Sequence, residues 1–468
     1  NFYSYTQPDH PGINNHWLTG VVVFLIERRM GFAGLGIFHT LLFGLTLWIF
    51  FRITEKTTNF SYAFFFSILS LPLITSRTEV RPEVLSYLFL GIYLWILSEV
   101  RTGKARSTIL WILPLIQVFW VNMHIFFIFG IFLIGAFFLE AGGIKKDFSL
   151  AQRYFGVGVL SALVCLINPF GLEGALAPFT IFSNYGYMVA ENQSVVFMQK
   201  RMPHNYLYIH FEGLFLVCIS SFLLVVRRRS WKPYFLPGLL LGFFSGLSWK
   251  VIRAIPLFGF LFIPFSAANL YRFMEDRFPG RNRILKKLFV LFSVVMILVA
   301  FSFKDFYYSP YTKLKSPNSF FGTMPGVNGS AEFFKKNNME GPIFNNYDIG
   351  GYLIYHLFPK ERVFVDNRPE AYTSSFFKDI YVPMQEDETV WKKMDQRYQF
   401  NAIYFYRHDM TPWAQPFLMR RIQDPGWAPV FVDDYTIILL KRNEKNALLI
   451  RWYELPRRLF KSALLGRD

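Results

Sequence analysis

The sequence predicts a mostly α-helical membrane protein with about ten transmembrane helices and a C-terminal α/β domain on the extracytoplasmic side. Of its 468 residues, 53% are hydrophobic and 20% are aromatic, a more apolar composition than soluble domains have. Apolar runs fill residues 32–303, and basic residues gather in the short segments between these runs. After about residue 304, short β-rich runs alternate with amphipathic stretches, which is typical of a layered α/β domain.

Each apolar run is a candidate span, because a helix needs about 20 residues to cross the hydrocarbon core. The predicted spans are residues 32–52, 60–76, 83–99, 107–122, 124–140, 154–169, 212–226, 234–249, 252–267 and 286–303. Residues 1–31 form an outward first segment, in which residues 17–30 predict an amphipathic helix at the membrane interface. The sequence begins with Asn1 rather than Met, so we expect a further preceding helix, which would bring the spans to eleven.

Lys and Arg residues indicate the orientation of the spans, because cytoplasmic segments are enriched in them. They collect in alternate segments, namely 52–56, 101–106, 145–153, 227–232 and 272–287. These segments are predicted to be cytoplasmic, and the turns between them to face outward. The net charge of +17 thus follows from topology. Nucleic-acid binding, which needs a basic stripe on a soluble face, is not expected.

The C-terminal part divides into an α/β domain at 304–442 and a basic tail at 443–468. Predicted strands are 342–346, 362–366, 402–406, 430–432 and 436–440, and predicted helices are 331–338, 351–357, 387–398 and 413–423. Gly350 and Gly351 either bind an anion at a helix start or allow a tight strand-to-helix turn. The tail is either an amphipathic helix or poorly ordered. The two cysteines, Cys165 and Cys218, lie in apolar runs and predict no disulfide framework.

Polar residues converge on the outward ends of the spans, where ionisable groups are expensive and indicate function. An acidic residue, imidazoles and several cations at one depth fit a substrate that carries a phosphate. The candidates are Asp9, His16, Arg81, Asn122, His124, Glu191, Lys250 and Arg253.

Each candidate also has a structural interpretation. The three cations would suit lipid headgroups at the interface. Asn122 and His124 would satisfy helix ends at a tight turn, and Asp9 would form an Asx turn between two prolines. A divalent metal on the histidines, Asp9 and Glu191 is compatible with their chemistry, but their spacing matches no metal motif, so no metal site is predicted.

Several motifs together resemble a known family. They are the outward Asp9 followed by His16-Trp17-Leu18, Arg81-Pro82, Trp120-x-Asn122-x-His124, Asn168-Pro169-Phe170-Gly171, FNNYDIGGYL at 344–353 and VFVDNR at 363–368. The chain resembles uncharacterised bacterial polytopic membrane proteins that are similar to the glycosyltransferase C superfamily. That superfamily includes protein mannosyltransferases and lipid A aminoarabinose transferases. The resemblance runs over nearly the whole chain.

The resemblance implies a glycosyltransferase of the bacterial cytoplasmic (inner) membrane that uses a polyprenyl-phosphate-linked sugar as donor. The acceptor, a glycan, lipid or protein, would arrive from the periplasmic side. By this resemblance Asp9 is the catalytic base. Arg81, Lys250 and Arg253 would bind the donor phosphate, and the substrate pocket would contain His16, Asn122, His124 and Glu191. The paired acidic residues of mannosyltransferases are absent, since His10 follows Asp9.

A second hypothesis is a non-catalytic membrane scaffold whose soluble domain docks a partner in a larger assembly. The aromatic content and the Asp366-Asn367-Arg368 motif suit such an interface. A transporter is a weaker alternative, because the sequence shows no inverted repeat and no matching pair of broken spans.

Overall fold

Six helices in the described part of the chain are long and apolar enough to cross a membrane. They are Trp17–Thr57, Glu83–Arg101, Ile125–Lys145, Phe148–Leu166, Tyr206–Val226 and Ile252–Arg277. The computed structural model describes residues 1–468 except 78, 181–184, 227–230, 303–321, 325 and 461–468. The chain forms two units. The helical unit contains Asn14–Thr180 and Val189–Lys313, and the α/β unit contains Asn1–Ile13, Ile181–Met188 and Leu314–Asp468.

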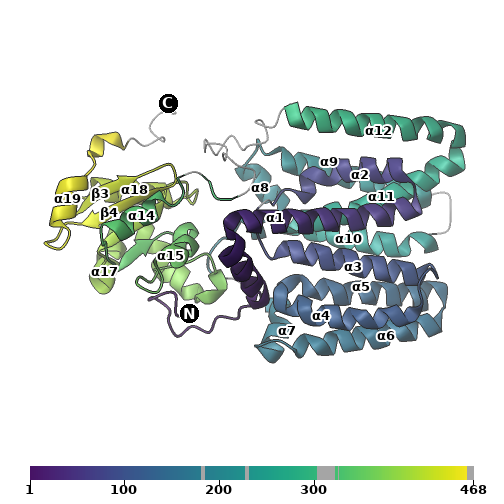
Figure 1. Cartoon of the computed structure of the whole chain (residues 1–468), viewed down its shortest axis with the longest axis horizontal. Coiled ribbons are helices and arrows are strands. Elements are labelled where there is room, and N and C mark those ends of the chain that lie inside the picture. Colours follow the sequence, from purple (N-terminus) through teal and green to yellow (C-terminus); the bar gives the residue numbers. More distant parts are fainter. Residues whose placement is uncertain (78, 181–184, 227–230, 303–321, 325, 461–468) are drawn as a thin grey trace. The chain divides into compact units, whose positions relative to one another are not determined.

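Every predicted span falls on a helix of the helical unit (Figure 1). The helices are α1 (Trp17–Thr57), α2 (Phe60–Ile74), α3 (Glu83–Arg101), α4 (Ile112–Met123), α5 (Ile128–Leu139), α6 (Phe148–Leu163), α7 (Gly171–Thr180), α8 (Val195–Arg201), α9 (Tyr206–Val226), α10 (Phe235–Lys250), α11 (Ile255–Arg277) and α12 (Pro279–Ser302). The helical character of the ten segments is therefore confirmed. That all ten cross a membrane stays a prediction, and residue 303 at the end of the last span lies outside the described residues.

A glycine divides α1 into two segments. Gly31 has φ 63° and ψ −169°, a conformation that residues with a side chain rarely adopt. The segment before it matches the predicted interfacial helix, and the segment after it begins where the first span is predicted. Figure 1 shows the two segments meeting at an angle.

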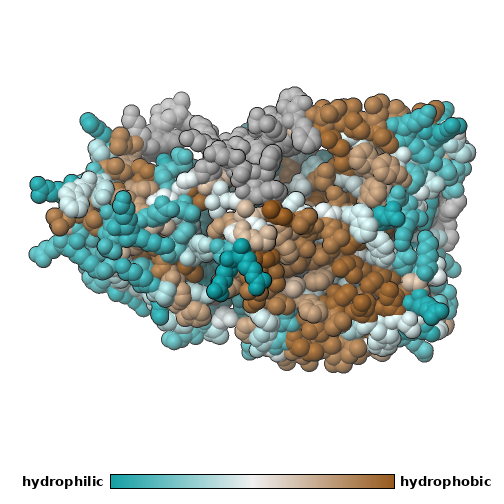
Figure 2. All heavy atoms as spheres, viewed as in Figure 1, coloured by the Kyte–Doolittle hydropathy of each residue, from teal (hydrophilic) through white to brown (hydrophobic). Residues whose placement is uncertain are grey.

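The core of the helical unit is built around α11. This helix is buried from Ile255 to Ala268 with few interruptions, and it packs against α1, α2, α9 and α10. By contrast, α12 leaves Ile284, Leu291 and Leu298 more than half exposed. Figure 2 shows the apolar flank of the bundle that such side chains form. An apolar exposed flank is what a helix facing lipid requires.

Basic residues meet acidic partners at one end of the helical unit. Lys56 Nζ lies 2.9 Å from Glu99 Oε1, and Arg101 binds the buried carboxylate of Glu140 through Nε and Nη2, both at 2.6 Å. These contacts join the ends of α1, α3 and α5, so three of the predicted cytoplasmic segments lie together. Figure 2 shows this hydrophilic end at the right. The predicted basic positions 227–229 lie outside the described residues.

A four-stranded sheet forms the centre of the α/β unit. Its strands, in the order β1-β2-β4-β3, are β1 (Ile343–Asn345), β2 (Ala402–Tyr406), β4 (Thr436–Lys441) and β3 (Trp427–Val432). β1 pairs with β2 in parallel, and the other neighbours are antiparallel. The helices are α14 (Gly329–Lys336), α15 (Gly350–Leu357), α16 (Pro383–Glu386), α17 (Glu388–Tyr398), α18 (Ala414–Gln423) and α19 (Ala447–Tyr453). Residues 461–468 of the predicted tail lie outside the described residues.

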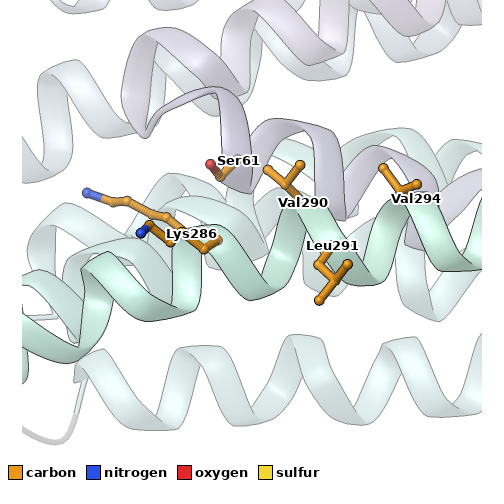
Figure 3. Close-up of a pocket in the computed structure, with 6 residues that line it drawn as sticks. Ser61, Lys286, Val290, Leu291 and Val294 are labelled. Carbon is orange, nitrogen blue, oxygen red and sulfur yellow. The ribbon is translucent and has the colours of Figure 1, made fainter.

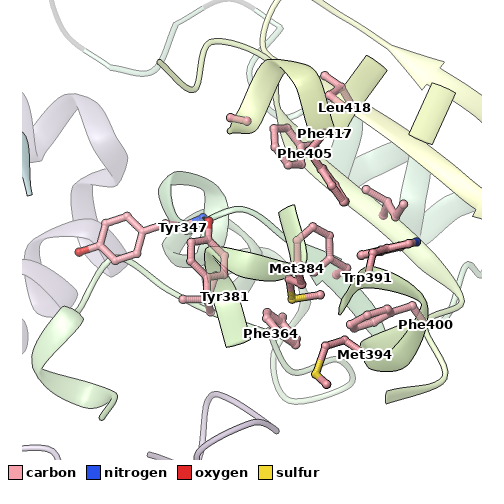
Figure 4. Close-up of a cluster of buried hydrophobic side chains, with 14 of the residues drawn as sticks. Tyr347, Phe364, Tyr381, Met384, Trp391, Met394, Phe400, Phe405, Phe417 and Leu418 are labelled. Atoms are coloured by element: carbon pink, nitrogen blue, oxygen red, sulfur yellow. The ribbon is translucent and has the colours of Figure 1, made fainter. Parts of the chain in front are cut away.

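Helices cover both faces of this sheet. Alternate residues of each strand point to opposite sides, and the strands carry apolar residues on both sides, so each face forms a core with helices. Phe344, Ile403 and Leu439 belong to the core on one face, together with Trp391 and other aromatic side chains. Figure 4 shows Trp391 in this core with Phe400 and Phe417. A second core on the other face contains Ile343, Ala402, Tyr404, Ile438 and Leu440, with Phe334 of α14, Leu353 of α15 and Ile450 of α19 packed among them.

The prediction of a strand at 362–366 is wrong. In this segment Val363 makes only an isolated bridge with Ser4, although residues 363–366 are all buried. The side chain of Asn345 replaces a strand ladder, since its Nδ2 donates to the Val365 carbonyl at 2.7 Å and its Oδ1 accepts from the Phe364 N–H at 2.9 Å. The short β-rich run therefore indicated burial correctly but not sheet pairing.

Close packing explains the two glycines at 350–351. A Cβ on Gly350 would lie 2.3 Å from the carbonyl oxygen of Val365, and one on Gly351 would lie 3.0 Å from Oδ1 of Asn367. This geometry favours the tight turn over an anion site at the start of α15.

Candidate anion site

Three arginine side chains surround the carboxylate of Glu191. Arg77 Nη2 and Arg81 Nη1 donate to Oε2 at 2.7 and 3.0 Å, and Arg253 Nη2 lies 3.8 Å from Oε1. Guanidinium groups bind carboxylates and phosphates with the same planar set of N–H donors. We call Arg77, Arg81 and Arg253 the arginine cluster.

A second carboxylate lies deeper in the same place. Glu83 Oε1 is 3.3 Å from Arg253 Nη2 and 3.6 Å from Arg77 Nη2, and the Glu83 side chain is 5% exposed. Together with Glu79 at the rim, these carboxylates balance the three guanidinium charges. Glu79, whose side chain is 64% exposed, lies at the rim, 3.9 Å from Arg81 Nε.

Two of the arginines keep an unused donor. The Nε atoms of Arg77 and Arg253 are buried, and no hydrogen-bond partner reaches them in the described part of the chain. Buried donors are almost always paired, so an unpaired donor calls for an explanation such as an absent ligand. The same holds for Nδ1 of His16.

Three turns of the helical unit bring these residues together. Arg77 and Arg81 lie in the segment between α2 and α3, and Glu83 begins α3, where the positive end of the helix dipole favours a carboxylate. Arg253 lies in the turn Ile252–Ala254 between α10 and α11. The N–H of Ile252 donates to the carbonyl of Gln193 at 3.0 Å, which fixes this turn to the segment that carries Glu191.

Two histidines lie beside the arginine cluster. The rings of His16 and His124 stack with centroids 5.0 Å apart, and Nδ1 of the buried His124 is 2.8 Å from Ser86 Oγ. The Arg253 guanidinium lies over the ring of Phe126, 5.7 Å from its centroid. The faces of these rings are an apolar surface beside the cluster, and the ring nitrogens of the two histidines are its polar atoms.

Asn122 uses its whole amide group to hold helices together. Its Oδ1 accepts from Trp17 Nε1 at 2.8 Å, and its Nδ2 donates to the carbonyls of Val118 and Ile167 at 2.7 and 2.8 Å. The structural interpretation of Asn122 is thereby favoured, because both hydrogens of its Nδ2 are used and its Oδ1 already accepts one hydrogen bond. It positions the start of α1, where His16 and Trp17 lie.

Burial and the charges of the cluster together shift the pKa values of Glu191 and His16. Burial raises the pKa of Glu191, but the positive charges of Arg253, Arg77 and Arg81 outweigh burial and hold the pKa below its ordinary value. Burial lowers the pKa of His16, and Arg253 lowers it further against the opposing effect of Glu83. At neutral pH Glu191 is therefore charged and His16 is neutral.

The structure joins five of the eight predicted site residues to this network or its edge: Arg81, Arg253, Glu191, His16 and His124. Asn122 lies next to them as a helix connector. Lys250 is exposed at the end of α10, and the described residues offer it no ion pair. Asp9 is exposed and belongs to the α/β unit. The roles assigned to Lys250 and Asp9 stay predictions.

Sequence reasoning missed Arg77 and Glu83. Both lie in the same segment between α2 and α3 as Arg81 or at its end, and Glu83 completes the Arg81-Pro82-Glu83 motif. The sequence therefore showed that these two residues are charged and near Arg81. It could not show whether they belong to the site or only face lipid headgroups.

A groove elsewhere in the helical unit has a different character (Figure 3). It lies between α2 and α12 and is lined by Ser61, Lys286, Lys287, Val290, Leu291 and Val294. Two lysines above an open apolar surface suit a lipid headgroup and its chains rather than a reaction site.

No group of three or more His, Cys, Asp or Glu side chains is arranged to hold a metal ion among the described residues. In comparisons with known proteins, no family model matches the chain and no curated protein matches it. The arginine cluster is thus the candidate site, and its geometry carries the functional argument.

Proposed function

We propose that this protein is a multi-pass membrane glycosyltransferase that moves a sugar from a polyprenyl-phosphate donor to an acceptor outside the cytoplasm. It would span the bacterial inner membrane about ten times. Its α/β unit would face the periplasm, where it would meet a glycan, lipid or protein acceptor. The charge distribution of the loops supports this orientation.

The observation that carries the proposal is the arginine cluster with its unpaired buried donors. A phosphate monoester or diester offers oxygens to several N–H groups at once, and the cluster offers three guanidinium groups with two buried Nε atoms unused. A phosphate that takes the place of one carboxylate keeps the charge of the cluster balanced, whereas a neutral ligand does not.

The position of the cluster within the helical unit supports a lipid-linked ligand. Arg253 precedes α11 and Glu83 begins α3, and both helices are apolar enough to cross a membrane. A phosphate at these helix ends would lie at the membrane interface, with its polyprenyl chain among apolar side chains.

In the proposed reaction, an acceptor hydroxyl attacks the anomeric carbon of the donor sugar. The bond between that carbon and the phosphate oxygen breaks, and the polyprenyl phosphate leaves with the bonding electrons. The arginine cluster stabilises the charge that develops on the leaving phosphate. The Asp9 carboxylate takes the proton of the hydroxyl. Asp9 precedes His16 by seven residues, so the chain limits their Cα separation to about 25 Å.

Binding of farnesyl phosphate, a short isoprenyl phosphate, tests the phosphate site directly. Arg253→Ala should weaken binding about 10- to 100-fold, because charged hydrogen bonds contribute about 1.5–3 kcal/mol. Asp9→Asn should keep this binding and abolish transfer from a polyprenyl-phosphate sugar. Equal binding by wild type and Arg253→Ala would contradict the proposal. Absence of binding by both would favour the scaffold hypothesis, in which the ion pairs only hold turns together.

A further inference from the structure

Glu191 occupies the donors that a phosphate would need. Its two oxygens face Arg77, Arg81 and Arg253, and they are the nearest anionic atoms to all three in the described residues except for Glu83 beside Arg253. A carboxylate and a phosphate compete for the same N–H groups of a guanidinium. A ligand phosphate must therefore displace Glu191 or share its partners.

Glu191 is the carboxylate that can leave. Its side chain is 22% exposed, against 5% for Glu83. A released Glu191 would regain contact with water, whereas an unpaired Glu83 would stay buried at a large cost. The segment around Glu191 is also a short 3₁₀ turn, Ala190–Asn192, rather than a long helix.

The same segment is attached to the α/β unit at its other end. Tyr187 lies among the rings of Tyr347, Phe377, Tyr381 and Trp413, and its ring centroid is 4.4 Å from that of Tyr347. Its neighbour Gly186 has φ 74°, and a Cβ there would lie 2.4 Å from the carbonyl oxygen of Ser374. This end is thus closely fitted to the α/β unit.

We call residues 186–193 the strap. Tyr187 belongs to the α/β unit and Glu191 to the helical unit. Only residues 188–190 separate the two along the chain, and four residues of extended chain span at most about 14 Å.

We propose that Glu191 is a built-in competitor for the anion site, and that the strap transmits its displacement by a phosphate ligand to the α/β unit. The proposal rests on the phosphate site proposed above and adds a regulatory contact to it. In the absence of ligand, Glu191 pairs with the arginine cluster and holds the strap. When a phosphate binds, Glu191 is released and the strap loosens.

Affinity for farnesyl phosphate, measured with the full chain in nanodiscs, tests the first half. Glu191→Gln should bind about tenfold more tightly than wild type, because the competing charge is removed. Glu79→Gln is the matched control, since it removes the same charge at the exposed rim, and it should change affinity by less than about twofold. Weaker or equal binding by Glu191→Gln overturns the proposal while wild-type binding still upholds the phosphate site. Absence of binding in both chains overturns both.

An uncharged substitution tests the strap itself. Tyr187→Ala should tighten farnesyl phosphate binding about threefold in wild type, because a loosened strap presents Glu191 less often. The same substitution should have no effect in the Glu191→Gln background. Equal effects in the two backgrounds overturn the role of the strap. Amide-exchange protection of β2 confirms that the α/β unit is folded, and Tyr187→Leu, which keeps an apolar group, replaces the alanine variant if protection is lost.

Amide hydrogen exchange supplies a readout independent of affinity. Saturating farnesyl phosphate should increase exchange of strap residues 188–193 in wild type. The Ile252 amide, which donates to Gln193, should exchange faster as well. Unchanged or slower exchange at saturation overturns the proposal.

Discussion

Arg253 donates through Nη2 to Oε1 of Glu83 at 3.3 Å, and this pair joins the turn before α11 to the first residue of α3. Both side chains are largely buried. The pair is therefore part of the frame of the helical unit as well as the floor of the candidate anion site.

Glu83→Gln should lower the unfolding free energy of the helical unit by about 3 kcal/mol, because it leaves two arginines short of a buried counter-charge. Unfolding of the full chain in detergent measures the change. Glu79→Gln provides the control, with an expected change within about 0.5 kcal/mol. The same stability for both variants would show that the buried pair has no structural role.

Arg253→Lys should weaken farnesyl phosphate binding about tenfold, since an ammonium cannot reproduce the planar set of donors. Lys250→Ala, three residues earlier in the chain, should weaken it by less than about twofold because Lys250 is exposed and outside the cluster. Titration of the two variants in one lipid composition compares them. A larger loss for Lys250→Ala would return that residue to the phosphate site.

Asn345→Leu should destabilise the α/β unit by about 3 kcal/mol, because it removes both partners of the buried backbone at Phe364 and Val365. Asn345→Asp keeps the acceptor for the Phe364 N–H and loses the donor to Val365, so it tests the two hydrogen bonds separately. Amide-exchange protection of residues 363–366 is the measurement. Unchanged protection in Asn345→Leu would mean that the N-terminal segment alone holds this loop.

Asp348 gives the α/β unit a defined pH dependence. Burial and the nearby charge of Asp409 raise the pKa of Asp348 to about 6. In the unfolded chain the value is about 3.9, so between about pH 4 and 6 the unfolded state loses its proton first. The contribution of Asp348 to stability is thus fully present below pH 4 and is lost as the pH rises to 6.

Water reaches the Asp348 side chain, and we expect the loss to be only about 1 kcal/mol. The difference in unfolding free energy between wild type and Asp348→Asn, measured with the full chain at pH 4 and pH 7, isolates it. Wild type should lose stability relative to the variant as the pH rises. A constant difference, or one of opposite sign, would contradict the raised pKa.

The helices were predictable because one property, apolar length, defines them. The runs at 83–99 and 252–267 became α3 and α11 without any knowledge of their neighbours. The segment 362–366 was not predictable in the same way. Its partners are Asn345 and Ser4, and the second lies 359 residues away in the chain from Val363. The burial of a segment follows from its apolar composition. Whether its backbone pairs with a strand depends on which distant segment of the chain packs beside it.

The location of the candidate site was predictable from the sequence, but the predicted set of site residues was incomplete. Loop charges placed Arg81, Glu191 and Arg253 on one side, and the fold joins them directly. Arg77 and Glu83 were missed because a single sequence does not show which interfacial charges point inward. The packing of Tyr187 in the α/β unit was beyond sequence reasoning, since it depends on where the ring of Tyr347 lies.

A cryo-EM structure of the full chain in nanodiscs with saturating farnesyl phosphate would show where the phosphate binds. We expect phosphate density within hydrogen-bond distance of Arg77, Arg81 and Arg253, with Glu191 turned away from them. Phosphate density at another place, with Glu191 still bound to all three arginines, would contradict it.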